Sequence, residues 1–102
     1  MFVRWHKLAL AELDEIISQA HERNPQEALN MRSAVERTLN TLQMFPKAGR
    51  YVRAGDWHEK YVPHTRLIFI YRFTDDELAI IATFHTSREP KTKPLERRFD
   101  EL

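Results

Sequence analysis

The residues with the clearest capacity for chemistry lie near the end of the chain, where Arg88 follows His85 by three positions. A histidine can transfer a proton near neutral pH, and an arginine can stabilise negative charge on a phosphoryl group. His85, however, continues the strand pattern of Ile81 and Thr83, which favours a packed or hydrogen-bonded histidine over a proton-transfer residue. For Arg88 two interpretations stay open: a solvated charge at the end of the strand, or a contact to a partner protein.

The chain offers little else for catalysis or metal binding. It contains no cysteine, which excludes a thiol nucleophile, a disulfide framework and a cysteine-ligated zinc ion. Its five histidines show no spacing that is typical of a zinc site. We therefore predict no metal and no cofactor.

The middle of the chain is basic, although the net charge of the whole protein is only +1. Between residues 47 and 72, Asp56 and Glu59 oppose six basic residues: Lys47, Arg50, Arg53, Lys60, Arg66 and Arg72. Such a segment could attract an acidic protein segment or a phosphate backbone, but the isoelectric point of about 8.1 is low for a dedicated nucleic-acid-binding protein. Arg72 lies in an apolar strand, so a structural ion pair competes there with a binding role.

Length and composition predict one small domain. A chain of 102 residues has room for one modest core, and its hydrophobic fraction of 42% and charged fraction of 30% are those of an ordinary globular protein. No apolar run approaches the ~18 residues that span a bilayer. Together with the lack of cysteine, this predicts a cytoplasmic protein with a folded core over residues 1–90 and a C-terminal tail over residues 91–102, which either forms a last helical turn or stays loose.

Two amphipathic helices are predicted in the first half of the chain. Apolar residues recur at intervals of three and four over residues 7–22. Asn24 and Pro25 then supply an N-cap and a first-turn proline, and a second apolar stripe runs to Phe45, where Pro46 ends the helix. The short connection predicts an antiparallel helix hairpin.

Strands are predicted at residues 2–5, 59–62, 67–73 and 77–85, the first of them at a sheet edge. In the last strand, Leu78, Ile80, Ala82 and Phe84 alternate with Ala79, Ile81, Thr83 and His85. Both faces of the last two strands are largely apolar, which indicates a sheet covered on both sides. We therefore predict an α+β domain of order β-α-α-β-β-β, with the helix hairpin packed on a small, mainly antiparallel sheet.

Five local sequences occur in the same order and spacing as in a known family. They are Val3-Arg4-Trp5 leading into Ala11-Glu12-Leu13-Asp14-Glu15-Ile16; Asn24-Pro25; Phe45-Pro46-Lys47-Ala48-Gly49-Arg50; Ile70-Tyr71-Arg72; and Phe84-His85-Thr86-Ser87-Arg88-Glu89-Pro90. Over about residues 2–90 the chain resembles the ParE/RelE superfamily of toxins from bacterial type II toxin-antitoxin (plasmid stabilization) systems. The closing segment, with its histidine and arginine, is similar to the ParE branch.

The resemblance implies one of two toxic mechanisms. RelE-type members cleave mRNA on the ribosome, whereas ParE-type members bind DNA gyrase and need no catalytic residues. The RelE pattern has an arginine where this chain has Ile68 and a tyrosine where it has Pro94. Both departures favour the ParE branch. A RelE-like endoribonuclease using His85 and Arg88, and a degenerate member without toxicity, remain the alternatives.

The resemblance also implies partners. We expect a cognate antitoxin and DNA gyrase, with contacts at Arg50, Arg53, Arg72, His85 and Arg88, and either a homodimer or a toxin-antitoxin heterotetramer. The antitoxin tail is expected to fold across the helix hairpin and the sheet edge, with acidic residues near the arginines of the middle segment.

Overall fold

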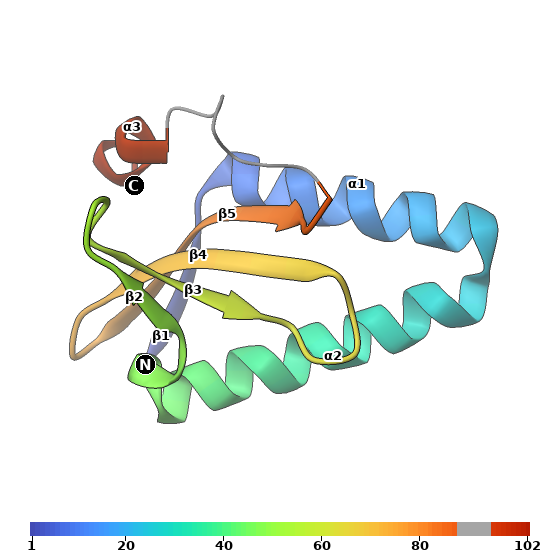
Figure 1. Cartoon of the computed structure of the whole chain (residues 1–102), viewed down its shortest axis with the longest axis horizontal. Coiled ribbons are helices and arrows are strands. Elements are labelled where there is room, and N and C mark those ends of the chain that lie inside the picture. The colour runs from blue at the N-terminus through green and yellow to red at the C-terminus, as the bar shows by residue number, and fades with distance from the viewer. Residues whose placement is uncertain (88–94) are drawn as a thin grey trace.

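The computed structural model describes residues 1–87 and 95–102. Two long helices lie against one face of a twisted sheet, and a short helix lies on the other face (Figure 1). In chain order the elements are β1 (Phe2–Trp5), α1 (Lys7–Arg23), α2 (Pro25–Met44), the 3-10 turn η1 (Pro46–Ala48), β2 (Arg50–Val52), β3 (Trp57–Tyr61), β4 (Leu67–Phe73), β5 (Glu77–His85) and α3 (Leu95–Asp100). This architecture confirms the predicted fold class.

The helix hairpin forms where the capping residues predicted it. The His6 side chain caps α1 by accepting a hydrogen bond from the backbone N–H of Leu8 at 3.1 Å. Asn24 serves both helices, because its backbone N–H donates to Ala20 at the end of α1 while its side chain accepts from Gln26 at the start of α2. A single residue therefore links the two helices and fixes their sharp reversal.

The sheet has five strands in the order β1-β5-β4-β3-β2. β1 pairs in parallel with β5, and all other neighbours are antiparallel. The sheet is therefore mainly antiparallel, as the sequence predicted. Strand β2, a three-residue strand at the edge of the sheet beside β3, was not predicted. β3 begins at Trp57, two residues earlier than expected.

The predicted alternation of β5 is wrong beyond Ile80. Tyr71 of β4 faces Ile80, whereas the preceding Ile70 faces Ala82, so Ile81 is an extra residue that bulges from the ladder. The bulge moves the following side chains to the opposite faces. Ala82 therefore packs on the face away from the long helices, together with Ile70 and Ile81.

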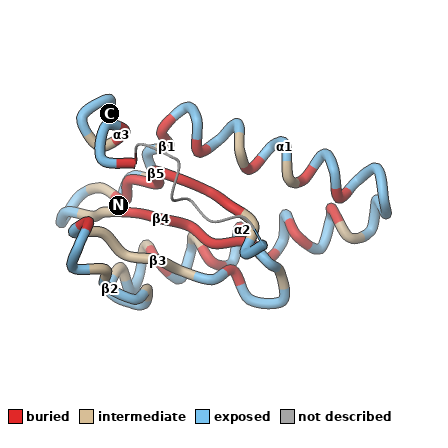
Figure 2. Tube along the Cα trace, turned by 45° about the horizontal axis from the view of Figure 1, so that its top comes forward, coloured by how far each residue is buried: buried red, intermediate tan, exposed pale blue. Residues whose placement is uncertain are grey.

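Two apolar clusters hold the layers together. Leu13, Val35, Phe69 and Ile80 belong to the larger one, between the helix hairpin and the sheet. The smaller one lies on the opposite face under α3, whose Leu95 is buried (Figure 2). Residues 95–102, which sequence analysis placed in a C-terminal tail, thus include a helix packed on the sheet. None of the helices in the described residues is long and apolar enough to cross a membrane.

Candidate functional site

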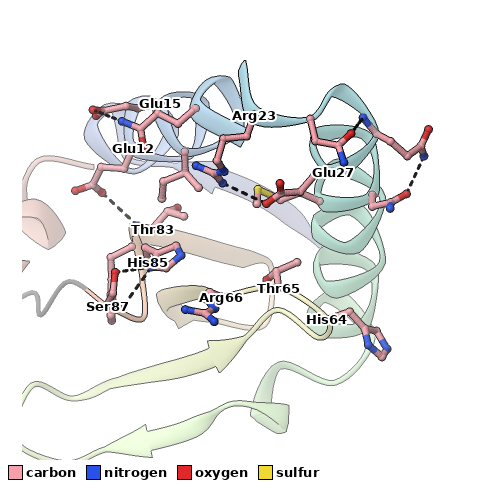
Figure 3. A pocket seen from close by; sticks show the side chains of 17 residues that line it. Glu12, Glu15, Arg23, Glu27, His64, Thr65, Arg66, Thr83, His85 and Ser87 are labelled. Atoms are coloured by element: carbon pink, nitrogen blue, oxygen red, sulfur yellow. Dashed lines mark hydrogen bonds and ion pairs between the residues drawn. The ribbon is translucent and has the colours of Figure 1, made fainter. Parts of the chain in front are cut away.

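A groove of about 1140 Å³ opens between the turn of the helix hairpin and the neighbouring ends of β4 and β5 (Figure 3). We call it the hairpin groove. Its helical wall carries acids and amides, whereas its sheet wall carries hydroxyl and basic side chains. The principal residues of the helical wall are Glu12, Glu15, Gln19, Arg23, Glu27 and Asn30, and those of the sheet wall are His64, Thr65, Arg66, Thr83, His85 and Ser87.

His85 lines this groove, and Ser87 contacts its imidazole ring. The backbone N–H of Ser87 donates to Nδ1 of His85 at 3.2 Å, and the Ser87 hydroxyl lies 2.7 Å from the same nitrogen. Nδ1 is therefore an acceptor, so a neutral ring carries its proton on Nε2. The only lone pair of the neutral ring is already engaged, which matches the hydrogen-bonded histidine that the sequence favoured. Arg88 lies outside the described residues.

Glu12, which lines the groove, belongs to an ion pair that was not predicted from the sequence. Arg98 of α3 donates two hydrogen bonds to the carboxylate of Glu12, at 2.8 and 3.2 Å, and a third to the carbonyl of Ile81 at 3.1 Å. The same carboxylate accepts the backbone N–H of Thr83 at 3.2 Å. Both side chains are largely buried, with 7% of Arg98 and 17% of Glu12 exposed.

The position of this pair follows from the sheet. β1 pairs with β5 only as far as Ile80, so the outer edge of β5 has no neighbouring strand beyond that point. The Ile81 carbonyl and the Thr83 N–H would be left without partners there, and burying such groups is costly. The Glu12–Arg98 pair satisfies both. Sequence patterns place Glu12 on a polar helix face and Arg98 in a tail, so no local signal predicts their contact.

The three arginines of the middle segment that were predicted to bind partners, Arg50, Arg53 and Arg72, lie elsewhere. Arg50 pairs with Glu59 of β3 at 3.0 Å. Arg72 donates to the carbonyls of Gly55 at 2.9 Å and Asp56 at 2.7 Å, and its guanidinium lies 3.5 Å from the ring centroid of Phe99. A structural role for Arg72 was predicted as an ion pair, but carbonyl oxygens and an aromatic ring are its partners.

Arg53 is exposed and makes no ion pair with any of the residues that the structure describes. Neither it nor the other two arginines line the hairpin groove. The basic residue of the middle segment that does line it is Arg66, at the entry to β4. Its position could not be inferred from charge alone, because it depends on how the β3–β4 loop meets the helix hairpin.

Tyr71 explains the segment that follows the second helix. Its hydroxyl donates to the Pro46 carbonyl at 2.6 Å and accepts the Gly49 N–H at 3.0 Å, so it ties η1 and β2 to the central strand. A Cβ atom at position 49 would lie 2.5 Å from that hydroxyl oxygen. Only glycine, which has no Cβ, avoids this clash. Burial raises the pKa of Tyr71 above its ordinary value, although the Gly49 N–H opposes the shift.

Within residues 1–87 and 95–102, no group of three histidine or acidic residues is placed to hold a metal ion. The described part of the groove offers hydrogen-bonding groups, charges of both signs and apolar surface.

Comparison with known proteins identifies the class. A solved structure described as the chromosomal ParDE TA system from P. aeruginosa has a similar fold, with a TM-score of 0.71 at 20% sequence identity. The match covers 83% of this chain and 95% of that one. Residues 3–90 match the model of a family described as the ParE toxin of type II toxin-antitoxin system, parDE. The chain belongs to this ParE toxin family. No curated protein matches it.

Proposed function

We propose that this protein is the toxin of a type II toxin-antitoxin pair, that it stops growth by binding DNA gyrase in the cytoplasm, and that a cognate antitoxin neutralises it. The family match over residues 3–90 is the observation that carries the proposal. Expression of the chain alone should arrest growth, and co-expression of the protein encoded beside it should restore growth. A chain that leaves growth unaffected when expressed in folded form would instead be a member without toxicity.

Two features of the structure favour gyrase binding over mRNA cleavage. Ile68, which stands where the nuclease pattern has an arginine, is only 5% exposed and packs in the apolar cluster under α3. His85 has its Nδ1 lone pair engaged by Ser87. Neither position then offers what cleavage needs, namely a cation for the phosphoryl charge and a free base for the 2′-hydroxyl.

The hairpin groove is the surface that we assign to the antitoxin. A volume of about 1140 Å³ accommodates several side chains of a partner segment. Its lining includes the apolar Ile16, Met31 and Phe84, against which apolar side chains of that segment can pack. Exposed Arg66 on the sheet wall offers a contact to an acidic residue of that segment. A tail that is disordered when free can fold into such a groove on binding.

A charge reversal tests this assignment. We expect Arg66→Glu to weaken the complex with the antitoxin by about tenfold or more, because it places a carboxylate opposite an acidic partner. Arg32→Glu is the matched control, since Arg32 is exposed on α2 and does not line the groove. If both variants bound the antitoxin with equal affinity, the assignment of the groove as its binding surface would be wrong. If no protein encoded by a neighbouring gene bound the chain, the proposal that it has a cognate antitoxin would be wrong.

A further inference from the structure

The basic middle segment is only partly explained by the fold and the hairpin groove. Arg50 is paired with Glu59, Arg72 holds two carbonyls and an aromatic ring, and Arg66 lines the groove. Three cations of the segment remain without such a role. They are Lys47, Arg53 and Lys60, and none of them lines the groove.

These cations lie around the β2–β3 edge of the sheet, together with two aromatic side chains. Tyr51 of β2 faces His58 of β3 in the ladder, and the centroids of their rings are 5.2 Å apart. His58 and Lys60 point to the same side of β3, because alternate residues of a strand share a face. We call Lys47, Tyr51, Arg53, His58 and Lys60 the basic strip.

Electrostatics supports the closeness of Lys47 to His58. Burial lowers the pKa of His58 below its ordinary value, and the charge of Lys47 lowers it further, although Asp56 opposes them. Lys47, Tyr51 and Arg53 are exposed, and Lys60 is half-buried.

The acids near the strip are already engaged. Asp56 accepts a hydrogen bond from the Tyr51 hydroxyl at 2.8 Å, and Glu59 pairs with Arg50 at 3.0 Å. The Tyr51–Asp56 contact also raises the pKa of Tyr51. Asp56 keeps its negative charge in this contact, so the three cations outnumber the one acid that has no ion pair among the described residues, and the strip has a net positive charge.

We propose that the basic strip binds the phosphodiester backbone of duplex DNA. The strip combines cations with the exposed side chain of Tyr51 on an edge strand. A phosphate backbone needs only the charges and hydrogen-bond donors that the strip presents. The strip is separate from the hairpin groove, so the protein could hold a protein partner and DNA together.

The test measures binding of the purified full-length protein to a fluorescent duplex of about 20 base pairs by anisotropy, over a salt series. If the strip neutralises three phosphates, a plot of log Kd against the logarithm of the salt concentration should have a slope of about 2.7. Affinity should then fall about 40-fold between about 50 and 200 mM salt. The triple variant Lys47→Ala/Arg53→Ala/Lys60→Ala should lose this salt-dependent binding. Each single substitution should lower the slope by about 0.9.

The matched control is Lys7→Ala/Arg32→Ala/Arg37→Ala, which removes three exposed cations from the long helices and changes the net charge equally. It should bind DNA as the unaltered protein does, and circular dichroism checks that both variants stay folded. The proposal is overturned if the unaltered protein does not bind at low salt, or if the control loses as much affinity as the strip variant. A labelled polyglutamate peptide that binds more tightly than DNA would equally overturn it, since the strip would then serve an acidic protein.

Discussion

Replacing Arg98 with alanine removes the cation that α3 places against Glu12, a residue of the hairpin groove. The change deletes two hydrogen bonds to Glu12 and one to the Ile81 carbonyl. It takes from the Glu12 carboxylate, of which only 17% is exposed, a guanidinium that donates two hydrogen bonds to it. Breaking a buried ion pair by removing one partner costs about 3–5 kcal/mol, because the remaining charge stays desolvated.

The lower end of that range applies here, because Glu12 keeps the Thr83 N–H as a donor and is partly in contact with solvent. We expect Arg98→Ala to lower the free energy of unfolding by about 3 kcal/mol and the Tm by about 12–24 °C in a domain of this size. In Arg98→Lys the charge is kept, but a lysine cannot donate two parallel hydrogen bonds to a carboxylate. The decrease in unfolding free energy should therefore be smaller than for Arg98→Ala.

Urea and thermal unfolding, followed by circular dichroism, measure both changes. Arg97→Ala is the internal control, since Arg97 is the exposed neighbour on the same helix, and it should stay within about 0.5 kcal/mol of the unaltered protein. The reasoning would be refuted if Arg98→Ala were no less stable than Arg97→Ala. In that case α3 would contribute nothing to the fold through its charge.

Three other changes test the packing and titration of the β-sheet. Tyr71→Phe removes the hydrogen bonds to Pro46 and Gly49 and should cost about 2 kcal/mol in urea unfolding, with no comparable loss for the exposed Tyr61→Phe. Gly49→Ala should cost roughly 1–3 kcal/mol by the same measurement, because its Cβ would lie 2.5 Å from the Tyr71 hydroxyl; a neutral result would contradict the close approach. Since the pKa of His58 is lowered by folding, the stability from its neutral ring is complete above the unfolded value of 6.5 and is lost as the pH falls from there through the lower folded value. His58→Gln should therefore show a smaller fall in Tm between about pH 7.5 and pH 5 than the unaltered protein, and equal falls would refute the shift.

The sequence predicts the elements that have strong local signals. Asn24 and Pro25 mark the reversal between the helices, and the helix boundaries agree with the structure to within a residue. Strands β4 and β5 were predicted with their bounds, because long apolar runs between turn residues are distinctive. The bulge at Ile81 was not predicted, since it arises from pairing between strands and leaves no mark on the composition of β5.

The candidate site was predicted less well, because its contacts join distant parts of the chain. His85 was identified, and its contact to Ser87 is local. The Glu12–Arg98 pair spans 86 positions, and the position of Arg66 in the groove depends on packing between the β3–β4 loop and the helices. Charge counting found the basic segment but could not separate the arginines that hold the fold together from the cations that form no ion pair within residues 1–87 and 95–102.

The most direct test of the proposed function is a pair of assays on the same purified toxin. We predict that it blocks supercoiling of relaxed plasmid DNA by gyrase, that the antitoxin reverses this inhibition, and that mRNA translated on ribosomes stays intact. The opposite result would be codon-dependent mRNA cleavage that is abolished by His85→Ala in a folded protein, while supercoiling is unaffected. That outcome would contradict gyrase binding and establish the nuclease mechanism in its place.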